Sequence, residues 1–425
     1  MNDRAPARAP ARREFLRASL AAAAWAAVAA PRASHARIPG ANDRIHIGII
    51  GCGGMGTHHV NRYRNLAEDP RYNIALAAVC DIYKPRLARA VEQSGGARGF
   101  HDYRKMLDLP DLDAVLIATP DHWHARMAID ALEAGKDVHV EKPMTLTWEE
   151  ARDLWRTAER TGRIVQVGAE GCSDDLLWRG RELIEAGQLG KIVWSTGGVF
   201  RNNKHGDWNY DVEPECTPDT LDWDAFLGPA PKRPFDPERF FRYRKYWDYS
   251  GGLAHDLLAH ILSGLLICLK PQFPRRVMAS GGIYVHHDRE TPDTFHVMLD
   301  YPGDHSVSLF TTQTTEEGID FVIRGEHASL RLDESGGHEN STLILKPERE
   351  FAEGRERQVF TRRPRPDHDE NWIACMRSRE APVFDARMGY QVMVALDLAN
   401  RSWREGKMML FDPEREEMRW QNGVV

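Results

Sequence analysis

The feature that most constrains the fold is a glycine-rich turn that directly follows an apolar run. Residues 45–50 read Ile-His-Ile-Gly-Ile-Ile, and glycines follow at positions 51, 53 and 56. A helix-like segment then begins at Thr57, so the G-x-G-x-x-G pattern lies in the strand–turn–helix context that gives it weight. Gly51 permits a tight turn, Gly53 lets backbone approach a pyrophosphate, and Gly56 lets helix and strand pack closely. The pattern predicts dinucleotide binding, although a turn of an ordinary βαβ unit has the same local sequence.

An acidic residue closes the next predicted strand. Residues 73–81 form a second apolar run that ends at Asp81. A carboxylate at this point is placed to accept hydrogen bonds from an adenosine ribose. It favours NAD because it would repel a 2′-phosphate, while the nearby Lys84 and Arg86 leave NADP open.

The first 36 residues are predicted to be a twin-arginine signal peptide, outside the fold. An arginine pair and Phe-Leu (residues 12–16) precede an alanine-rich run over 18–30, and residues 34–36 offer a cleavage site. The apolar run is too short to span a bilayer comfortably; an alanine-rich helical tail is the alternative. We expect a periplasmic or secreted protein without stable membrane insertion, exported after folding and with its nucleotide already bound.

Chain length, composition and net charge restrict the number of domains and the kinds of partner that this protein can have. The 425 residues, 42% hydrophobic and 28% charged, are enough for two globular domains. A net charge of −7 and the lack of a basic block in the body of the chain argue against nucleic acid as a partner. The six cysteines are scattered and form no disulfide framework, so we expect buried thiols.

Alternating strand and helix patterns predict a doubly wound parallel sheet, a Rossmann domain over residues 42–170. Thr147, with Glu150 three residues later, reads as a capping box for the last helix of this set. Predicted helices cover 84–93, 103–107, 124–134 and 148–161, and further strands cover 114–119, 137–141 and 164–168.

The pattern changes after residue 170, and strands follow one another without crossover helices. This succession predicts an antiparallel sheet in a second α+β domain, residues 171–425. Residues 201–250 form a long aromatic and proline-rich loop. Loops of that length in a compact domain usually have a function. Strands are predicted over 191–196, 276–285, 294–299, 306–312, 320–324, 328–332 and 342–345, and helices over 174–186, 369–377 and 386–405.

Glu141-Lys142-Pro143 ends a predicted parallel strand, where ligands bind in open α/β sheets. An ammonium group there can hold a hydroxyl or carbonyl oxygen and relay a proton. A solvated surface lysine is the alternative. Thr119-Pro120-Asp121-His122-Trp123-His124 follows the preceding strand, so its side chains are candidates for the nicotinamide border; His124 is equally the start of the next helix.

Asp256 and His260 stand four residues apart on a predicted helix after Gly251-Gly252. An aspartate in that position can orient a histidine and raise its basicity, which gives a general base. A plain contact on the helix surface is the alternative. No third ligand with suitable spacing accompanies the pair, so no metal is predicted.

Together these motifs, in this order and spacing, resemble the glucose–fructose oxidoreductase / inositol dehydrogenase / rhizopine-catabolism oxidoreductases (Gfo/Idh/MocA). The resemblance covers nearly the whole chain after residue 42, and residues 221–231 resemble the exported bacterial branch. It implies a Rossmann domain, an open-faced antiparallel sheet used for homo-oligomers, a nicotinamide cofactor and sugar-like substrates. It implies a catalytic set of Lys142, Asp256 and His260. The implied cofactor-binding residues are Gly51, Gly53, Gly54, Met55, Gly56, Asp81, Thr119, Pro120, His122, His124, Glu141 and Lys142.

The main functional hypothesis is an NAD(P)-dependent oxidoreductase acting on a secondary alcohol of a sugar or glycoside. Export away from a metabolic nucleotide pool favours a tightly bound cofactor, and it also suits an NAD-dependent glycosidase that oxidises its sugar transiently. A non-catalytic sugar or nucleotide sensor is the alternative of another class. Residues 169–172 lack the aromatic and basic residues often seen there in the family, which leaves the sugar open. Aromatic residues of the long loop that could stack on a pyranose are Trp208, Tyr210, Trp247 and Tyr249.

Overall fold

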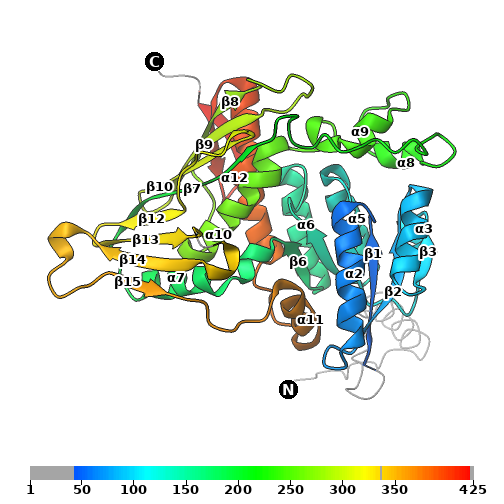
Figure 1. Ribbon diagram of the computed structural model, residues 1–425, viewed down its shortest axis with the longest axis horizontal. Helices are drawn as coiled ribbons and strands as arrows, with labels where there is room; N and C mark the ends of the chain where they lie inside the picture. Colours follow the sequence, from blue (N-terminus) through cyan, green and yellow to red (C-terminus); the bar gives the residue numbers. More distant parts are fainter. Residues whose placement is uncertain (1–42, 336, 422–425) are drawn as a thin grey trace, which may run out of the picture. The chain divides into compact units, whose positions relative to one another are not determined.

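The computed structural model describes residues 43–335 and 337–421 (Figure 1). The predicted signal peptide, residues 1–36, lies outside the described residues. Within the described residues, no helix is both long enough and apolar enough to cross a membrane. All six cysteines are described, and each is a buried free thiol, in keeping with their predicted role as small core residues.

The first half of the described chain forms a six-stranded sheet in the order β3-β2-β1-β4-β5-β6, with every neighbouring pair parallel. The central strands are apolar and buried, as expected for parallel strands covered by helices. The predicted doubly wound parallel sheet is therefore confirmed, whereas β3 is too short and polar for the pattern to reveal. The elements are β1 (Ile45–Ile50), α2 (Gly54–Glu68), β2 (Ile74–Cys80), α3 (Lys84–Gln93), β3 (Arg98–Phe100), α4 (Tyr103–Leu107), β4 (Ala114–Ile117), α5 (Asp121–Glu133), β5 (Asp137–Glu141), α6 (Trp148–Thr161) and β6 (Val165–Gly168).

Helix starts agree with the sequence where a side-chain cap marks them. The capping box of Thr147 and Glu150 is present at the start of α6, as predicted. In contrast, α5 begins at Asp121 and not at the predicted His124. Pro120 is extended and ends the preceding segment, so helical geometry begins with the next residue. Residues 121–124 consequently lie in the helix and not in a loop, so the helix sets the directions of their side chains.

The second half forms a larger sheet in the order β15-β14-β13-β12-β7-β10-β9-β8-β16-β17, and β11 pairs with β7. Most pairs are antiparallel, as predicted, but β7 and β10 are parallel. The long stretch between these two strands contains helices, which lets the chain return in the same direction. The strands are β7 (Ile192–Asn202), β8 (Arg276–Gly282), β9 (Thr294–Tyr301), β10 (His305–Thr312), β11 (Thr314–Thr315), β12 (Val322–Gly325), β13 (Ala328–Asp333), β14 (Thr342–Pro347), β15 (Gln358–Phe360), β16 (Met408–Asp412) and β17 (Glu417–Gln421).

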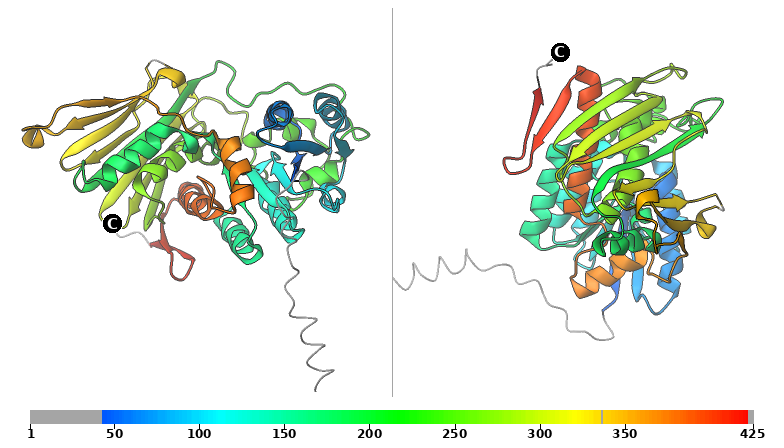
Figure 2. Two further views of the ribbon diagram at one scale, coloured as in Figure 1. Left: turned by 90° about the horizontal axis from the view of Figure 1, so that it is seen from below. Right: turned by 90° about the vertical axis from the view of Figure 1, so that its left-hand side faces the viewer.

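Three helices, α7 (Asp175–Glu185), α10 (Ala259–Leu269) and α12 (Ala386–Glu405), pack against one face of this second sheet (Figure 2). A further helix, α11 (His368–Ser378), comes late in the chain but packs into the core of the first sheet. There its Trp372 meets Tyr63 of α2 edge to face, with ring centroids 6.0 Å apart. The two sheets are thus joined by core packing as well as by the chain between them.

The long loop over residues 201–250 crosses from β7 to the first sheet. It carries two short helices, α8 (Trp223–Leu227) and α9 (Pro237–Phe241), which lie beside the α3 and α5 end of the first sheet in Figure 1. Backbone bonds fasten it there, from Lys84 to Thr220 (2.9 Å) and from Asp222 to Ile82 (3.2 Å). Its phenylalanines form an aromatic cluster around the buried Tyr83. The loop is therefore packed against the first sheet, and its residues form part of the lining of a cavity.

Candidate active site

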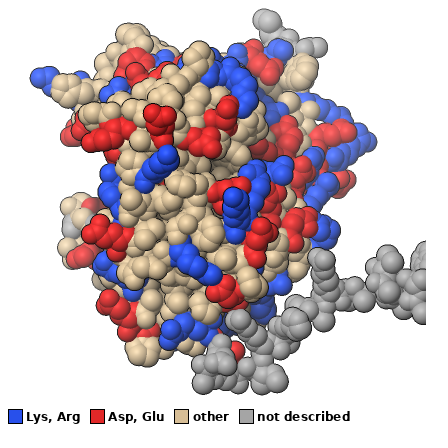
Figure 3. All heavy atoms as spheres, turned by 90° about the vertical axis from the view of Figure 1, so that its right-hand side faces the viewer, with Lys and Arg blue, Asp and Glu red and all other residues tan. Residues whose placement is uncertain are grey.

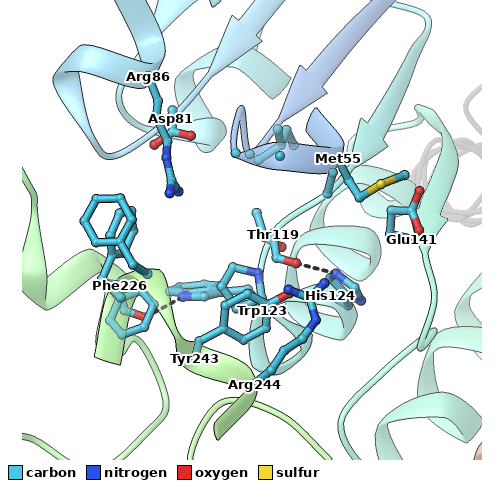
Figure 4. Close-up of a pocket in the computed structure, with 18 of the residues that line it drawn as sticks. Met55, Asp81, Arg86, Thr119, Trp123, His124, Glu141, Phe226, Tyr243 and Arg244 are labelled. Atoms are coloured by element: carbon cyan, nitrogen blue, oxygen red, sulfur yellow. Dashed lines mark hydrogen bonds between the residues drawn. The ribbon is translucent and has the colours of Figure 1, made fainter. Parts of the chain in front are cut away.

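A cavity of about 690 Å³ runs from the glycine turn after β1 to the helix that carries Asp256 and His260 (Figure 4). In the figure, Asp81 and Arg86 lie above the cavity, and Phe226, Tyr243 and Arg244 of the long loop lie below it together with Trp123 and His124 of α5. The volume lies within the range typical of ligand sites.

The glycine turn has the geometry that its sequence predicts. Gly51 has a φ of +86°, and a Cβ placed on it would lie 2.7 Å from the carbonyl oxygen of Ala118. A Cβ on Gly56 would lie only 1.8 Å from the carbonyl oxygen of Gly51, so α2 can pack on the turn only because residue 56 has no side chain. Both glycines shape the turn. Gly51 also lines the cavity, together with Gly53, Gly54 and Met55, whereas Gly56 does not.

The first turn of α2 is open toward the cavity. Gly53 is its N-cap and supplies no side-chain cap, and a Cβ on Gly54 would meet no heavy atom within 4 Å. Helix N-terminal N–H groups without a capping side chain bind anions such as phosphates. The bare backbone at this point therefore fits a pyrophosphate.

Asp81 lies at the end of β2 and lines the same cavity. One carboxylate oxygen accepts the backbone N–H of Cys52 at 2.7 Å, and the other accepts that of Tyr83 at 2.8 Å. Each oxygen keeps a second lone pair, so the carboxylate can also accept from a ribose hydroxyl. Burial raises the pKa of Asp81, while the charge of Arg86 opposes that rise. Arg86 lies over the Phe240 ring, 4.7 Å from its centroid, so it forms part of the wall near the predicted ribose position.

Some of the residues after β4 line the cavity, and others pack behind its lining. Thr119, Pro120 and His124 line the cavity, although the His124 ring is buried between two carbonyl oxygens, those of Pro143 (2.6 Å) and Thr119 (2.8 Å). His124 thereby ties the β4 loop to the β5 loop (Figure 4). His122, predicted to border the cofactor, lies behind the wall because the earlier start of α5 turns it toward the long loop.

That buried imidazole has a structural partner. His122 Nε2 lies 2.8 Å from the carbonyl oxygen of Phe226, which also accepts the Trp123 indole N–H at 2.9 Å. Burial lowers the pKa of His122 to about 4, so its ring is neutral. The pair fastens α8 of the long loop to α5.

The β5 end places Glu141 and Lys142 at the cavity with different partners. A Glu141 oxygen lies 2.7 Å from Nε2 of the buried His59. Burial alone would raise the pKa of Glu141, but the hydrogen bond and charge of His59 outweigh it and lower the pKa to about 2. Lys142 Nζ instead donates to Asp256, at 2.9 Å to Oδ1 and 2.8 Å to the backbone oxygen. The loop after β5 is thus joined directly to the helix of the second half.

Asp256 lies in a π-helical turn, Ala254–Leu258, that leads into α10. Its Oδ1 also accepts from Arg244 Nε at 3.1 Å, and its Oδ2 accepts from the Trp208 indole at 3.2 Å. Burial alone would raise its pKa, but the charges of Lys142 and Arg244 outweigh burial and hold the pKa well below its ordinary value. Asp256 is therefore ionised, and both of its carboxylate oxygens accept hydrogen bonds.

His260 lines the cavity with an exposed side chain, and the described residues give it no hydrogen bond from Asp256. The prediction that Asp256 orients His260 through a hydrogen bond is therefore wrong for this arrangement. The charge of Asp256 does raise the pKa of His260, as predicted, but other influences outweigh it. The carboxylate turns toward Lys142, and loss of hydration in the cleft, followed by the charge of Lys142, lowers the pKa of His260 to about 4. The imidazole is neutral at neutral pH and ready to accept a proton.

Sequence reasoning missed several residues that the long loop brings to this cavity. Trp208 and Tyr210, two of the predicted stacking residues, line it, whereas Tyr249 is buried in the aromatic cluster and Trp247 lies elsewhere. Arg244 carried no motif, and only the unusual length of the loop pointed to it. Further lining residues without a prediction include Tyr243, Phe226, Phe240 and Phe241 of the long loop, Arg201 of β7 and Glu170 of the short helix after β6.

Comparison with known proteins agrees with this geometry. Residues 45–169 match a family model described as the NAD-binding Rossmann fold of the Gfo/Idh/MocA oxidoreductases. Residues 181–423 match the C-terminal alpha/beta domain of the same family.

Curated relatives are similar over part of their length. An alpha-N-acetylgalactosaminidase of Shewanella oneidensis is 34% identical over 189 residues, 39% of each chain. The glycosyl hydrolase family 109 protein 2 of Shewanella sp. (strain ANA-3) is 36% identical over 232 residues, 46% of this chain and 49% of that protein. The chain thus spans less than half the length of these relatives.

Solved structures share the fold at low identity. Levoglucosan dehydrogenase with NADH and levoglucosan gives a TM-score of 0.66 at 18% identity, covering 89% of this chain and all of that one (100%). The WlbA dehydrogenase of Bordetella pertussis with NADH and UDP-GlcNAcA gives 0.65 at 22% identity, covering 87% and 99%. Because the C-terminal family model alone matches more than half of the chain, this protein belongs to the Gfo/Idh/MocA family of oxidoreductases.

Proposed function

We propose that this protein oxidises a secondary alcohol of a sugar or glycoside, with NAD as the hydride acceptor. The observation that carries the proposal is a shared cavity: Lys142 and His260, far apart in the chain, line the cavity that begins at the glycine turn. The solved dehydrogenases of similar fold, crystallised with NADH and sugar compounds, support the same class of substrate.

The residues present fit a dinucleotide. The uncapped start of α2 would hold the pyrophosphate, and the Asp81 carboxylate would hold the adenosine ribose. A nicotinamide held there would supply the acceptor for the hydride from the sugar carbon. Mass spectrometry of the nucleotide released on denaturing the purified protein tests both the cofactor and its proposed retention, and it separates NAD from NADP.

Lys142 and His260 have different roles in removing the proton of the substrate hydroxyl group. An ammonium group has three donors, and Asp256 takes two of those on Lys142. The third is free to hold the substrate hydroxyl oxygen. His260, with a neutral imidazole, takes the hydroxyl proton. Asp256 is the positioning residue for Lys142, because its carboxylate and its backbone oxygen both accept from the ammonium group.

The pH dependence of turnover tests this division of roles. The pKa of His260 is about 4, so its imidazole becomes protonated, and unable to accept a proton, only as the pH falls through that value. We expect kcat/KM for sugar oxidation to fall below about pH 4 and to stay level through 6.5, the ordinary value for histidine. His260→Gln should remove this acid limb, whereas His327→Gln, in the turn between β12 and β13 and outside the cavity lining, should keep it. A wild-type rate that stays level well below pH 4 would contradict the assignment of His260 as the base.

A second candidate is a redox-neutral glycosidase, and the names of the curated relatives favour it. Transient oxidation of a sugar acidifies the neighbouring C–H and allows a glycosidic leaving group to be eliminated. Purified protein incubated with p-nitrophenyl N-acetyl-α-galactosaminide and no added NAD separates the two candidates. Nitrophenol released over many turnovers supports the glycosidase, and accumulation of a keto-sugar supports the oxidoreductase.

We also propose export through the twin-arginine pathway to the periplasm or outside the cell. The arginine pair, alanine-rich run and cleavage site within residues 1–36 support this, as does a folded body whose six thiols are all buried and unpaired. Cell fractionation of wild type and of an Arg12→Lys, Arg13→Lys variant tests it: the variant should stay in the cytoplasm.

The exposed face of the second sheet supports a homo-oligomer. Met278 of β8 and Met298 of β9 pair with each other, and both are 52% exposed. Trp194 of β7, 40% exposed, lies in the same sheet. Apolar patches of this kind mark interaction sites, whereas the face in Figure 3 carries interspersed acidic and basic residues. Light scattering on wild type and Met298→Asp measures whether this face joins copies of the chain.

A further inference from the structure

A second cleft of about 660 Å³ adjoins the candidate active site, and His260 lines both. It lies between α7 and α10 on one side and β7, β13, β14 and residues 319–321, just before β12, on the other. Its floor includes three glycines, Gly171, Gly198 and Gly264, which leave the backbone bare. The imidazole proposed to touch the reacting hydroxyl therefore stands at the entrance to a further space, which neither the proposed oxidation nor the cofactor uses.

The lining of this cleft combines apolar and ionised groups. Phe321 and the 41%-exposed Ile319 offer apolar surface, and beside them Asp320 and Arg331 form an ion pair at 3.0 Å. A pyranose has apolar C–H faces that pack on such surface and hydroxyl groups that bond carboxylates and guanidinium groups. The cleft therefore has the chemistry that a neutral sugar ring requires.

The balance of charge argues against a phosphorylated or nucleotide occupant. Four carboxylates line the cleft against two guanidinium groups. Asp174 is paired with Arg362, outside the lining, at 2.6 Å, so three carboxylates remain against two guanidinium groups, and an anion would be repelled by this excess. The ionised residues are Asp174, Asp320, Asp333, Glu334, Arg331 and Arg357.

We propose that the second cleft binds a second sugar residue, linked glycosidically to the sugar that is oxidised. The substrate is then a disaccharide or a longer glycoside and not a free monosaccharide. This assignment rests on the proposed function, because it takes the reacting sugar to lie between Lys142 and His260. Binding of a remote part of the substrate supplies energy for positioning at the reacting carbon, so the second sugar raises kcat/KM.

Gly171 offers a way to fill the cleft without touching the proposed catalytic residues. It is exposed in the short helix Glu170–Ser173, and a Cβ built on it meets no heavy atom within 4 Å. Gly171→Trp would place an indole in the cleft, and Gly171→Ala is the matched control. Thermal unfolding of both variants verifies that each is folded.

The experiment compares matched substrates, the methyl α-glycosides of glucose, galactose and N-acetylgalactosamine, each with a disaccharide that carries the same sugar α-linked to galactose or glucose. For the sugar that is oxidised, we expect wild type and Gly171→Ala to favour the disaccharide in kcat/KM by about ten-fold or more, a difference of about 1.4 kcal/mol. Gly171→Trp should lose this preference while keeping its rate with the methyl glycoside. Equal kcat/KM for both substrates in wild type, or equal loss of both in Gly171→Trp, would overturn the proposal.

A binding measurement separates this proposal from the proposed oxidation. If no sugar is oxidised or cleaved, the proposed function fails, and saturation-transfer NMR with the same disaccharides then decides on the cleft alone. A disaccharide signal present in wild type and Gly171→Ala but lost in Gly171→Trp supports the second-sugar site. A signal that is absent from all three proteins, or equal in all three, overturns it.

Discussion

Replacing Lys142 with alanine is expected to lower the rate of hydride transfer by a factor of roughly 10² to 10⁴, the usual contribution of a positioned proton-handling group. The change removes the only ammonium group that lines the cavity among the described residues, and with it the donor that holds the substrate oxygen. NAD binding should change little, because Lys142 bonds to Asp256 and not to the glycine turn. Single-turnover absorbance of NADH at saturating sugar measures the effect, and nucleotide titration measures binding.

Two further variants make the result specific. Lys191→Ala removes a lysine whose partner is the exposed Asp304, and it should behave as wild type. Lys142→Arg keeps the charge but presents a planar fork in place of a compact ammonium, so it should recover little of the lost rate. A Lys142→Ala protein that keeps most of its turnover would contradict the assignment and would favour a sensor that binds sugar without chemistry.

Replacing Asp256 with alanine is expected to destabilise the fold by about 3–5 kcal/mol, in addition to removing activity. The carboxylate is the shared partner of Lys142 and Arg244, so its loss leaves two partly buried cations without compensation. The pKa of Asp256 lies below its ordinary value in the folded protein, so the stabilisation is complete at neutral pH and is lost as the pH falls below about 4. Urea unfolding at pH 7 measures the difference in free energy.

A surface pair provides the control for this loss. Asp224→Ala breaks the exposed pair with Lys232 and should cost at most about 1 kcal/mol. Adding Lys142→Met to Asp256→Ala removes one of the unpaired cations and should restore part of the lost stability. If Asp256→Ala unfolds at the same urea concentration as wild type, the three-residue pairing does not stabilise the folded state.

The features that the sequence predicted well are those set by neighbouring residues. The turn at Gly51 and Gly56 follows from backbone sterics within six positions, and the capping box of Thr147 and Glu150 from hydrogen bonds within one helical turn. Buried parallel strands can be recognised in the sequence as apolar runs. The predicted start of α5 was wrong, because the N-cap Pro120 makes no side-chain hydrogen bond that would mark it. The predicted direction of the second sheet was wrong at β7 and β10, where a long connection leaves the direction open.

The sequence by itself therefore determined the nucleotide fold, the family, and the three candidate residues Lys142, Asp256 and His260. Only the tertiary structure decided how they pair. Asp256 turns to Lys142, Arg244 and Trp208, which lie 114, 12 and 48 positions away, and not to its neighbour on the helix. Residues so far apart meet through the packing of the long loop between two sheets, and no local periodicity encodes that contact. The same packing decided that His260 faces two clefts, because each cleft is bounded by strands and helices from separate parts of the chain.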